Sequence, residues 1–106
     1  MDTNTSYKQI VKDVITQYAQ LTPSHGSIRL DTIFDEEQGH YALMQSGWDR
    51  GVRVRGNLLY IISRDGKVQI EYDGVGHGII DTLIKQGIPQ NDIILAYLNE
   101  QEAIAA

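Results

Sequence analysis

The sequence predicts one α+β domain, in which two helices pack on one face of a mostly antiparallel sheet. Apolar residues recur with helical spacing over 7–18 and again over 79–84. Between these two segments, apolar and polar residues alternate with the period of two that is typical of strands. The chain has 106 residues, which is enough for one hydrophobic core and too short for two, so we expect a single domain over residues 1–106.

The first helix is predicted over about residues 5–20. The apolar residues of this segment line one helical face: Tyr7, Ile10, Val11, Val14, Ile15 and Tyr18. Lys8 and Lys12 fall on the opposite, polar face. Pro23 disfavours helical backbone at the residue before it, so the helix should end shortly before this proline.

Four strands follow, joined by short polar loops as in an antiparallel meander. They are predicted over about 28–35, 40–48, 52–63 and 67–72. Asp65 and Gly66 separate the last two strands and should form a tight turn, because this pair accepts the positive φ angles of a short hairpin.

The third strand carries different residues on its two faces. The alternation places one set on one face, namely Val52, Val54, Leu58, Tyr60 and Ile62, and another on the other, namely Arg53, Arg55 and Asn57. We therefore expect the valines to face the helices and the two arginines to face solvent. Both faces are apolar over 58–62, so this end of the strand should be covered on both sides.

The carboxyl-terminal part of the chain predicts a second helix and a short final strand. The apolar stripe of residues 79–84 predicts a helix that Gly87 ends as its cap. The apolar run 93–98 predicts a strand buried on both faces. The tail 99–106 is expected to be either a short helical segment or disordered.

Composition excludes several classes of function. Because the chain has no cysteine, a disulfide scaffold, a cysteine-ligated zinc or iron–sulfur site and thiol catalysis are all excluded. Nine Lys and Arg against fourteen Asp and Glu give a net charge of −5, which disfavours DNA binding by the chain as a whole. Neither a membrane span nor a signal peptide is indicated, so we expect a cytoplasmic protein that has no contact with membranes.

Motifs of catalysis and metal binding are missing. His25, His40 and His77 lie in three separate predicted elements without metal-ligand spacing. The acidic run 35–37 lacks the pattern of a calcium-binding loop, and no serine stands in a nucleophile motif. We therefore expect no metal, no cofactor and no catalytic residues.

Two weaker features offer candidate binding sites. Five of the nine basic residues lie between 50 and 67, and Arg50, Arg53 and Arg55 among them lie close to Trp48. This group is either a surface for a protein partner or nucleic acid, or a solvated face of the sheet. The second feature is the turn 74–78. Its residues Gly74, Gly76, His77 and Gly78 could cradle an anion with backbone N–H groups, although the spacing matches no nucleotide-binding motif.

Specific strings spread over almost the whole chain resemble the XisI family, the controlling factors for excision of the fdxN element in cyanobacteria. These strings are Tyr7-x-x-Ile10-Val11, Ile15-x-x-Tyr18, Ile33-Phe34-Asp35, His40-Tyr41-x-Leu43, Gly47-Trp48-Asp49, Asp65-Gly66-Lys67-Val68, Tyr72-Asp73-Gly74 and Gly87-Ile88-Pro89-x-x-Asp92-Ile93-x-Leu95-Ala96-Tyr97. The resemblance implies a small α+β protein that acts beside a site-specific recombinase in a programmed DNA rearrangement. It also implies a XisH-type companion protein with a nuclease-like fold, but it supplies no catalytic or binding residues.

The function expected from these observations is that of a non-enzymatic accessory protein that controls DNA excision through protein partners. Two alternatives stay open: a regulator that binds a small ligand or nucleotide at the 74–78 turn, and a directionality factor that binds DNA directly through the arginines of 50–67. Trp48 and Tyr97 are apolar residues expected at the surface, so we also expect a homodimer or a complex with another protein.

Overall fold

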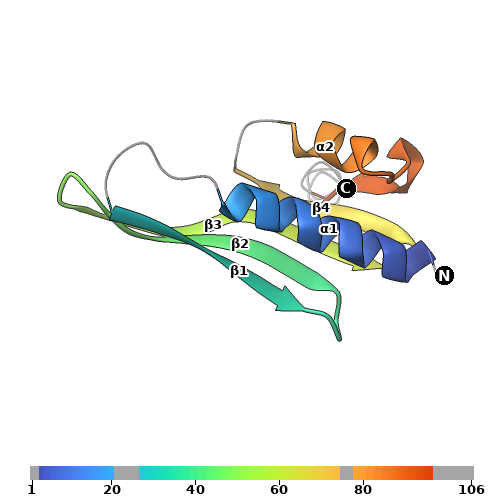
Figure 1. Cartoon of the computed structure of the whole chain (residues 1–106), viewed down its shortest axis with the longest axis horizontal. Helices are drawn as coiled ribbons and strands as arrows, with labels where there is room; N and C mark the ends of the chain where they lie inside the picture. The colour runs from blue at the N-terminus through green and yellow to red at the C-terminus, as the bar shows by residue number, and fades with distance from the viewer. Residues whose placement is uncertain (1–2, 21–26, 75–77, 97–106) are drawn as a thin grey trace, which may run out of the picture.

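A computed structural model of the chain describes residues 3–20, 27–74 and 78–96, and in it two helices cover one face of a single sheet (Figure 1). The elements in chain order are α1 (Thr3–Ala19), β1 (Ser27–Asp35), β2 (His40–Asp49), β3 (Val52–Arg64), β4 (Lys67–Asp73), α2 (Ile79–Lys85), the 3-10 helix η1 (Gln90–Asp92) and β5 (Ile93–Leu95). The α+β class and the predicted order of elements are thus confirmed. None of the described helices is long and apolar enough to cross a membrane.

The sheet has the order β1-β2-β3-β4-β5. The first four strands form the predicted antiparallel meander, and β5 pairs with β4 in parallel. Asp65 and Gly66 form the predicted tight turn between β3 and β4, with φ angles of 57° and 73°. This turn follows directly from the sequence, because few residue pairs other than Asp-Gly tolerate two successive positive φ angles.

The hydrophobic core lies between the helices and the sheet. It is built from fully or largely buried side chains of α1, α2, the central strands and the loop after α2: Tyr7, Val11, Val14, Ile15, Tyr41, Leu43, Leu59, Ile61, Val68, Ile70, Ile79, Leu83 and Ile88. The predicted apolar face of α1 supplies four of these residues, so its helical spacing correctly indicated the buried side.

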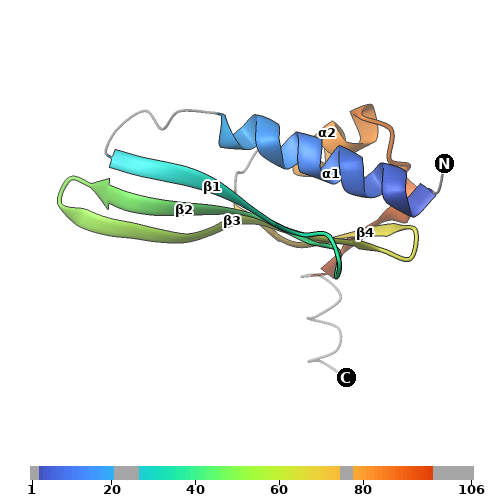
Figure 2. The ribbon, with the colours of Figure 1, turned by 60° about the horizontal axis from the view of Figure 1, so that its bottom comes forward.

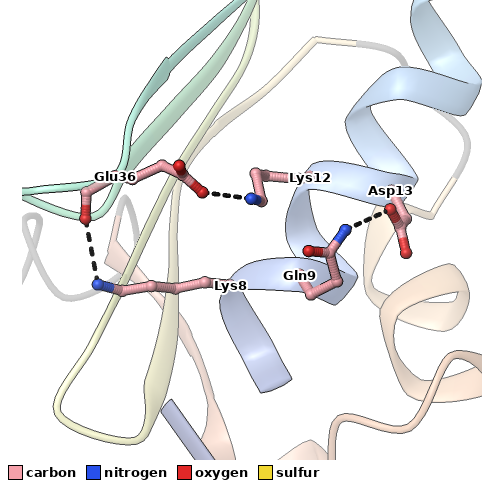
Figure 3. Close-up of polar contacts among 5 residues, drawn as sticks. All are labelled: Lys8, Gln9, Lys12, Asp13 and Glu36. Carbon is pink, nitrogen blue, oxygen red and sulfur yellow. Dashed lines mark hydrogen bonds and ion pairs between the residues drawn. The ribbon is translucent and has the colours of Figure 1, made fainter. Parts of the chain in front are cut away.

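Polar contacts fix α1 against the turn between β1 and β2. The Lys12 ammonium forms an ion pair with the Glu36 carboxylate, and Lys8 Nζ donates to the Glu36 backbone oxygen over 3.3 Å (Figure 3). On the same helix, Gln9 Nε2 donates to Asp13 Oδ1 over 2.9 Å. The hydrogen bond from Lys12 to Glu36 is the main cause that raises the pKa of this lysine above its usual value. Both lysines of the polar helical face therefore hold α1 to the β1–β2 turn.

The predicted faces of β3 are wrong beyond its midpoint. Leu43 of β2 pairs with Leu59, but the next residue, Met44, pairs with Asn57, so Leu58 is an extra residue in β3. Such a bulge shifts the alternation by one residue. Leu59 and Ile61 therefore face the helices, and Tyr60 and Ile62, which the sequence placed on the face of the valines, point the other way. Leu58, which the sequence placed on the same face as the valines, still packs against the core.

The prediction that this end of β3 is covered on both sides is confirmed. Ile61 is fully buried and its neighbour Ile62 is 6% exposed, although adjacent residues of a strand point to opposite faces. The final strand is shorter than predicted and ends at Leu95. Tyr97 and the tail 99–106 lie outside the described residues.

Candidate functional site

The outer face of the sheet, turned away from α1 and α2, presents the predicted basic cluster. The register assigns its residues: Leu43 is in the core, so Ala42, Met44, Ser46 and Trp48 of β2 must point the other way. Trp48 pairs with Arg53, and Ser46 pairs with Arg55, so both arginines share this face. The predicted orientation of Arg53 and Arg55, away from the helices, agrees with the register.

The basic end of the outer face, defined as Trp48, Arg50, Arg53 and Arg55, is organised around one stacked pair. The Arg53 guanidinium carbon lies 5.6 Å from the centroid of the Trp48 ring, within the range of a cation–π contact. Arg53 Nη1 also donates to the Gly47 backbone oxygen over 2.9 Å. These two contacts hold the guanidinium in place while Trp48 stays 54% exposed. Arg50 and Arg55 are exposed as well.

The basic end lies on a projecting part of the sheet. The hairpin of β2 and β3 extends beyond both helices, so neither sheet face is covered by a helix there (Figure 2). Val52 is on the helix-facing side by register but is 65% exposed. Val52 therefore points to the predicted side of the sheet, but it stays uncovered because α1 ends before reaching it. Arg50 adopts a positive φ of 54° at the tip of the hairpin.

A row of apolar and aromatic residues crosses the same face. Cross-strand pairing puts one residue of each of four strands side by side, in the order Ile33, Ala42, Tyr60 and Tyr72. The two ends of this apolar row are open to solvent, with Ile33 56% and Tyr72 48% exposed. In its middle, the Tyr60 hydroxyl lies 2.5 Å from His40 Nδ1.

The sequence did not point to the apolar row. Ile33 was expected among the alternating residues of its strand, but which residues of four strands stand in line depends on register. The register here depends on two irregularities, at Leu43/Met44 and at Tyr60/Ile61. Gly56 and Asn57, which are unfavourable in strands and directly precede the extra residue Leu58, are a local signal for the first shift. The second shift has no such signal, because Tyr60, Ile61 and Tyr72 around it are ordinary strand formers.

The Gly74–Gly78 turn is only partly described. Gly76 and His77 lie outside the described residues, so the anion site stays a prediction. Gly74 donates its backbone N–H to the Leu58 oxygen over 2.7 Å, so this N–H is already engaged within the fold. Gly78 precedes α2 with a φ of 59°, a left-handed backbone conformation that glycine adopts without strain.

Metal binding finds no support in the part of the chain that the structure describes, where no three His, Asp or Glu residues gather. His40 faces Tyr60, while His25 and His77 lie outside the described residues. The fold and the outer face together define a small two-layer α+β domain whose outer sheet face carries both the basic end and the apolar row.

Comparison with known proteins places this domain in a family. The family model described as XisI protein matches residues 1–104, and the chain belongs to the XisI family. The crystal structure of the fdxN element excision controlling factor XisI from Anabaena variabilis matches with 36% identity and a TM-score of 0.70, over 89% of this chain and 91% of that one. A XisI-like protein from the same organism matches with 26% identity and a TM-score of 0.76, over 87% and 84%. No curated protein matches.

Proposed function

We propose that this protein is a non-enzymatic accessory factor that controls site-specific DNA excision by binding protein partners through the outer face of its sheet. The process is that named for the XisI protein of Anabaena variabilis, an fdxN element excision controlling factor with 36% identity. Its expected partners are a XisH-type companion and the site-specific recombinase, all in the cytoplasm.

The arrangement of Trp48 and Arg53 carries this proposal. Tryptophan and arginine are enriched among the residues that dominate the energy of protein–protein interfaces. Here the two are held against each other at 5.6 Å on a projecting hairpin, and the Arg53 side chain is fixed by the Gly47 oxygen. A pre-ordered side chain loses less conformational entropy on binding than a free one. The exposed ends of the apolar row, Ile33 and Tyr72, add apolar surface on the same face.

The charge balance favours a protein partner over DNA. The chain carries a net charge of −5, so long-range repulsion opposes its approach to a phosphate backbone. The basic end is small, with Arg50, Arg53 and Arg55 as its only charged members, and three cations suffice to pair with carboxylates of an acidic protein. Direct binding of DNA by these arginines is kept as the alternative that the experiment decides.

The test is a binding measurement between the purified protein and a nuclease-fold companion. The double variant Arg53→Ala/Arg55→Ala should weaken association about tenfold or more, because it removes an anchor and a second cation from one surface. The matched control Arg64→Ala/Lys85→Ala removes the same charge far from the basic end and should leave association unchanged. Neither variant should change the free energy of unfolding by more than about 1 kcal/mol.

The outcomes separate the alternatives. Equal association of both double variants would overturn the role of the basic end. Retention of DNA by the wild-type protein alone, lost at high salt and in Arg53→Ala/Arg55→Ala, would replace the protein partner with DNA. Thermal stabilisation by a nucleotide would favour the regulator that uses the 74–78 turn.

A further inference from the structure

The strand β1 is the long free edge of the sheet. It pairs with β2 over all nine of its residues without a register shift, and no other described strand pairs with it. In Figure 1 no described element runs alongside its outer edge. The opposite edge strand, β5, has only three residues. An edge strand presents unpaired backbone N–H and C=O groups, which template pairing with another chain.

Several devices that natural proteins use to block edge pairing are missing from β1. The strand has no proline, no lysine and no bulge. Its charged residues, Arg29, Asp31 and Asp35, are of both signs. Arg29 and Asp31 stand two residues apart, so their side chains share the outer face. Their side chains are 78% and 45% exposed, and Arg29 Nε lies 3.0 Å from Asp31 Oδ1.

We infer that two copies of this chain pair antiparallel through β1, with Leu30 of one copy opposite Leu30 of the other. A two-fold axis normal to the sheet keeps side chains on their own face, so only registers that pair same-face residues are allowed. When the two-fold axis passes through the Leu30 pair, Arg29 of each copy lies opposite Asp31 of the other copy. The two charges are thus self-complementary in this register.

Neighbouring registers match the charges less well. Centring on Asp31 sets the two copies of this carboxylate against each other, and like charges directly opposite are destabilising. Centring on Thr32 pairs Arg29 with Asp35 of the second copy, but it sets Asp31 against Ile33. Only the Leu30 register gives each of these exposed charges an opposite charge across the edge.

The pairing has a consequence for the outer face. Ile33, the exposed end of the apolar row, comes opposite Ser27 of the second copy. Ser27 is itself paired with Trp48 within its own chain. The row of one copy therefore continues into Trp48 and Arg53 of the other, so the dimer joins two separate features into one surface. This inference does not require the proposed function, because it concerns self-association alone.

Charge reversal tests the inference. Wild-type protein should sediment as a dimer, and Arg29→Asp and Asp31→Arg should each raise the dimer dissociation constant at least about tenfold, since each sets two like-charge pairs across the edge. A mixture of the two single variants should form a heterodimer, visible by native mass spectrometry. The double variant Arg29→Asp/Asp31→Arg should form homodimers again, but should not exchange subunits with wild type.

Each outcome decides the question. A wild-type monomer at high protein concentration, or a dimer that neither reversal weakens, overturns the inference. Weakening by Arg29→Asp but not by Asp31→Arg indicates the Thr32 register and overturns the Leu30 register. Circular dichroism checks the folding of the single variants. If they do not fold, the double variant decides alone: exclusion from heterodimers with wild type supports the inference, and free exchange overturns it.

Discussion

The Tyr7 hydroxyl donates a hydrogen bond of 2.5 Å to Asp92 Oδ2, which joins the first turns of α1 to the 3-10 helix η1 across 85 positions of sequence. The other carboxylate oxygen of Asp92 accepts a bond of 3.0 Å from Lys67 Nζ at the start of β4. The Tyr7 bond first, and then the Lys67 bond, lower the pKa of Asp92 below its usual value. Three elements are thus held together by one carboxylate.

The lowered pKa of Asp92 predicts that part of the free energy of unfolding depends on pH in the acid range. Because the pKa of Asp92 is lower in the folded chain than the ordinary value of 3.8, its contribution is present above about pH 4 and is lost as the pH falls through the folded value. Asp92→Asn should therefore be less stable than wild type at neutral pH. The difference between the two should shrink as the pH falls towards 3, measured by urea unfolding at each pH.

A suitable control is Asp81→Asn, which removes an exposed carboxylate from α2. It leaves the Tyr7–Asp92–Lys67 contacts in place, so its acid unfolding should follow wild type. An Asp92→Asn variant with the same pH dependence as wild type would show that the carboxylate contributes nothing in this range.

Alanine substitutions at two turn glycines distinguish the cost of backbone strain from the cost of a steric clash. Gly39 and Gly66 have nearly equal φ angles of +76° and +73°, so an alanine is strained at both. A Cβ at Gly66 meets nothing within 4 Å, whereas at Gly39 it lies 2.3 Å from the Ser63 backbone oxygen. Gly66→Ala should cost about 1–2 kcal/mol of unfolding free energy, and Gly39→Ala about 3 kcal/mol or more. Denaturant unfolding measures both.

Equal losses at the two glycines would contradict this prediction, because the φ angles alone would then account for them. Gly39 is held in its position by two backbone bonds, from its N–H to the Asp35 oxygen and from the Ser63 N–H to its own oxygen, each of 2.8 Å. The turn therefore has little freedom to move away from an added methyl group.

The elements could be predicted because each depends on neighbours in sequence. Helical spacing gave α1 and its buried face, and the Asp65-Gly66 pair gave the β3–β4 turn. Arg53 and Arg55 were placed correctly because they precede the bulge at Leu58. The positions of Leu59 and Ile61 were not, because a single inserted residue reverses every face that follows it.

The sequence predicted only the part of the candidate surface that is formed by residues close together in the chain. Trp48 and Arg53 are five residues apart across one hairpin, so their proximity could be expected from the turn between them. The apolar row joins Ile33 to Tyr72 through two other strands, and its alignment depends on three strand registers. The exposure of Val52 depends on where α1 ends in space. The sequence pattern of β3 cannot predict that position.

The bulge itself gives the last prediction. Leu59 is fully buried in the core, whereas Leu58 is only partly buried. Leu59→Ala should lower the free energy of unfolding by about 2–5 kcal/mol, because it leaves a cavity in the core. Leu58→Ala should cost less, about 1–2 kcal/mol, since part of its apolar surface already contacts water. An unbroken alternation from Val52 would require the opposite order, with Leu58→Ala the more costly. Chemical denaturation of the two variants side by side therefore decides which residue β3 turns towards the helices.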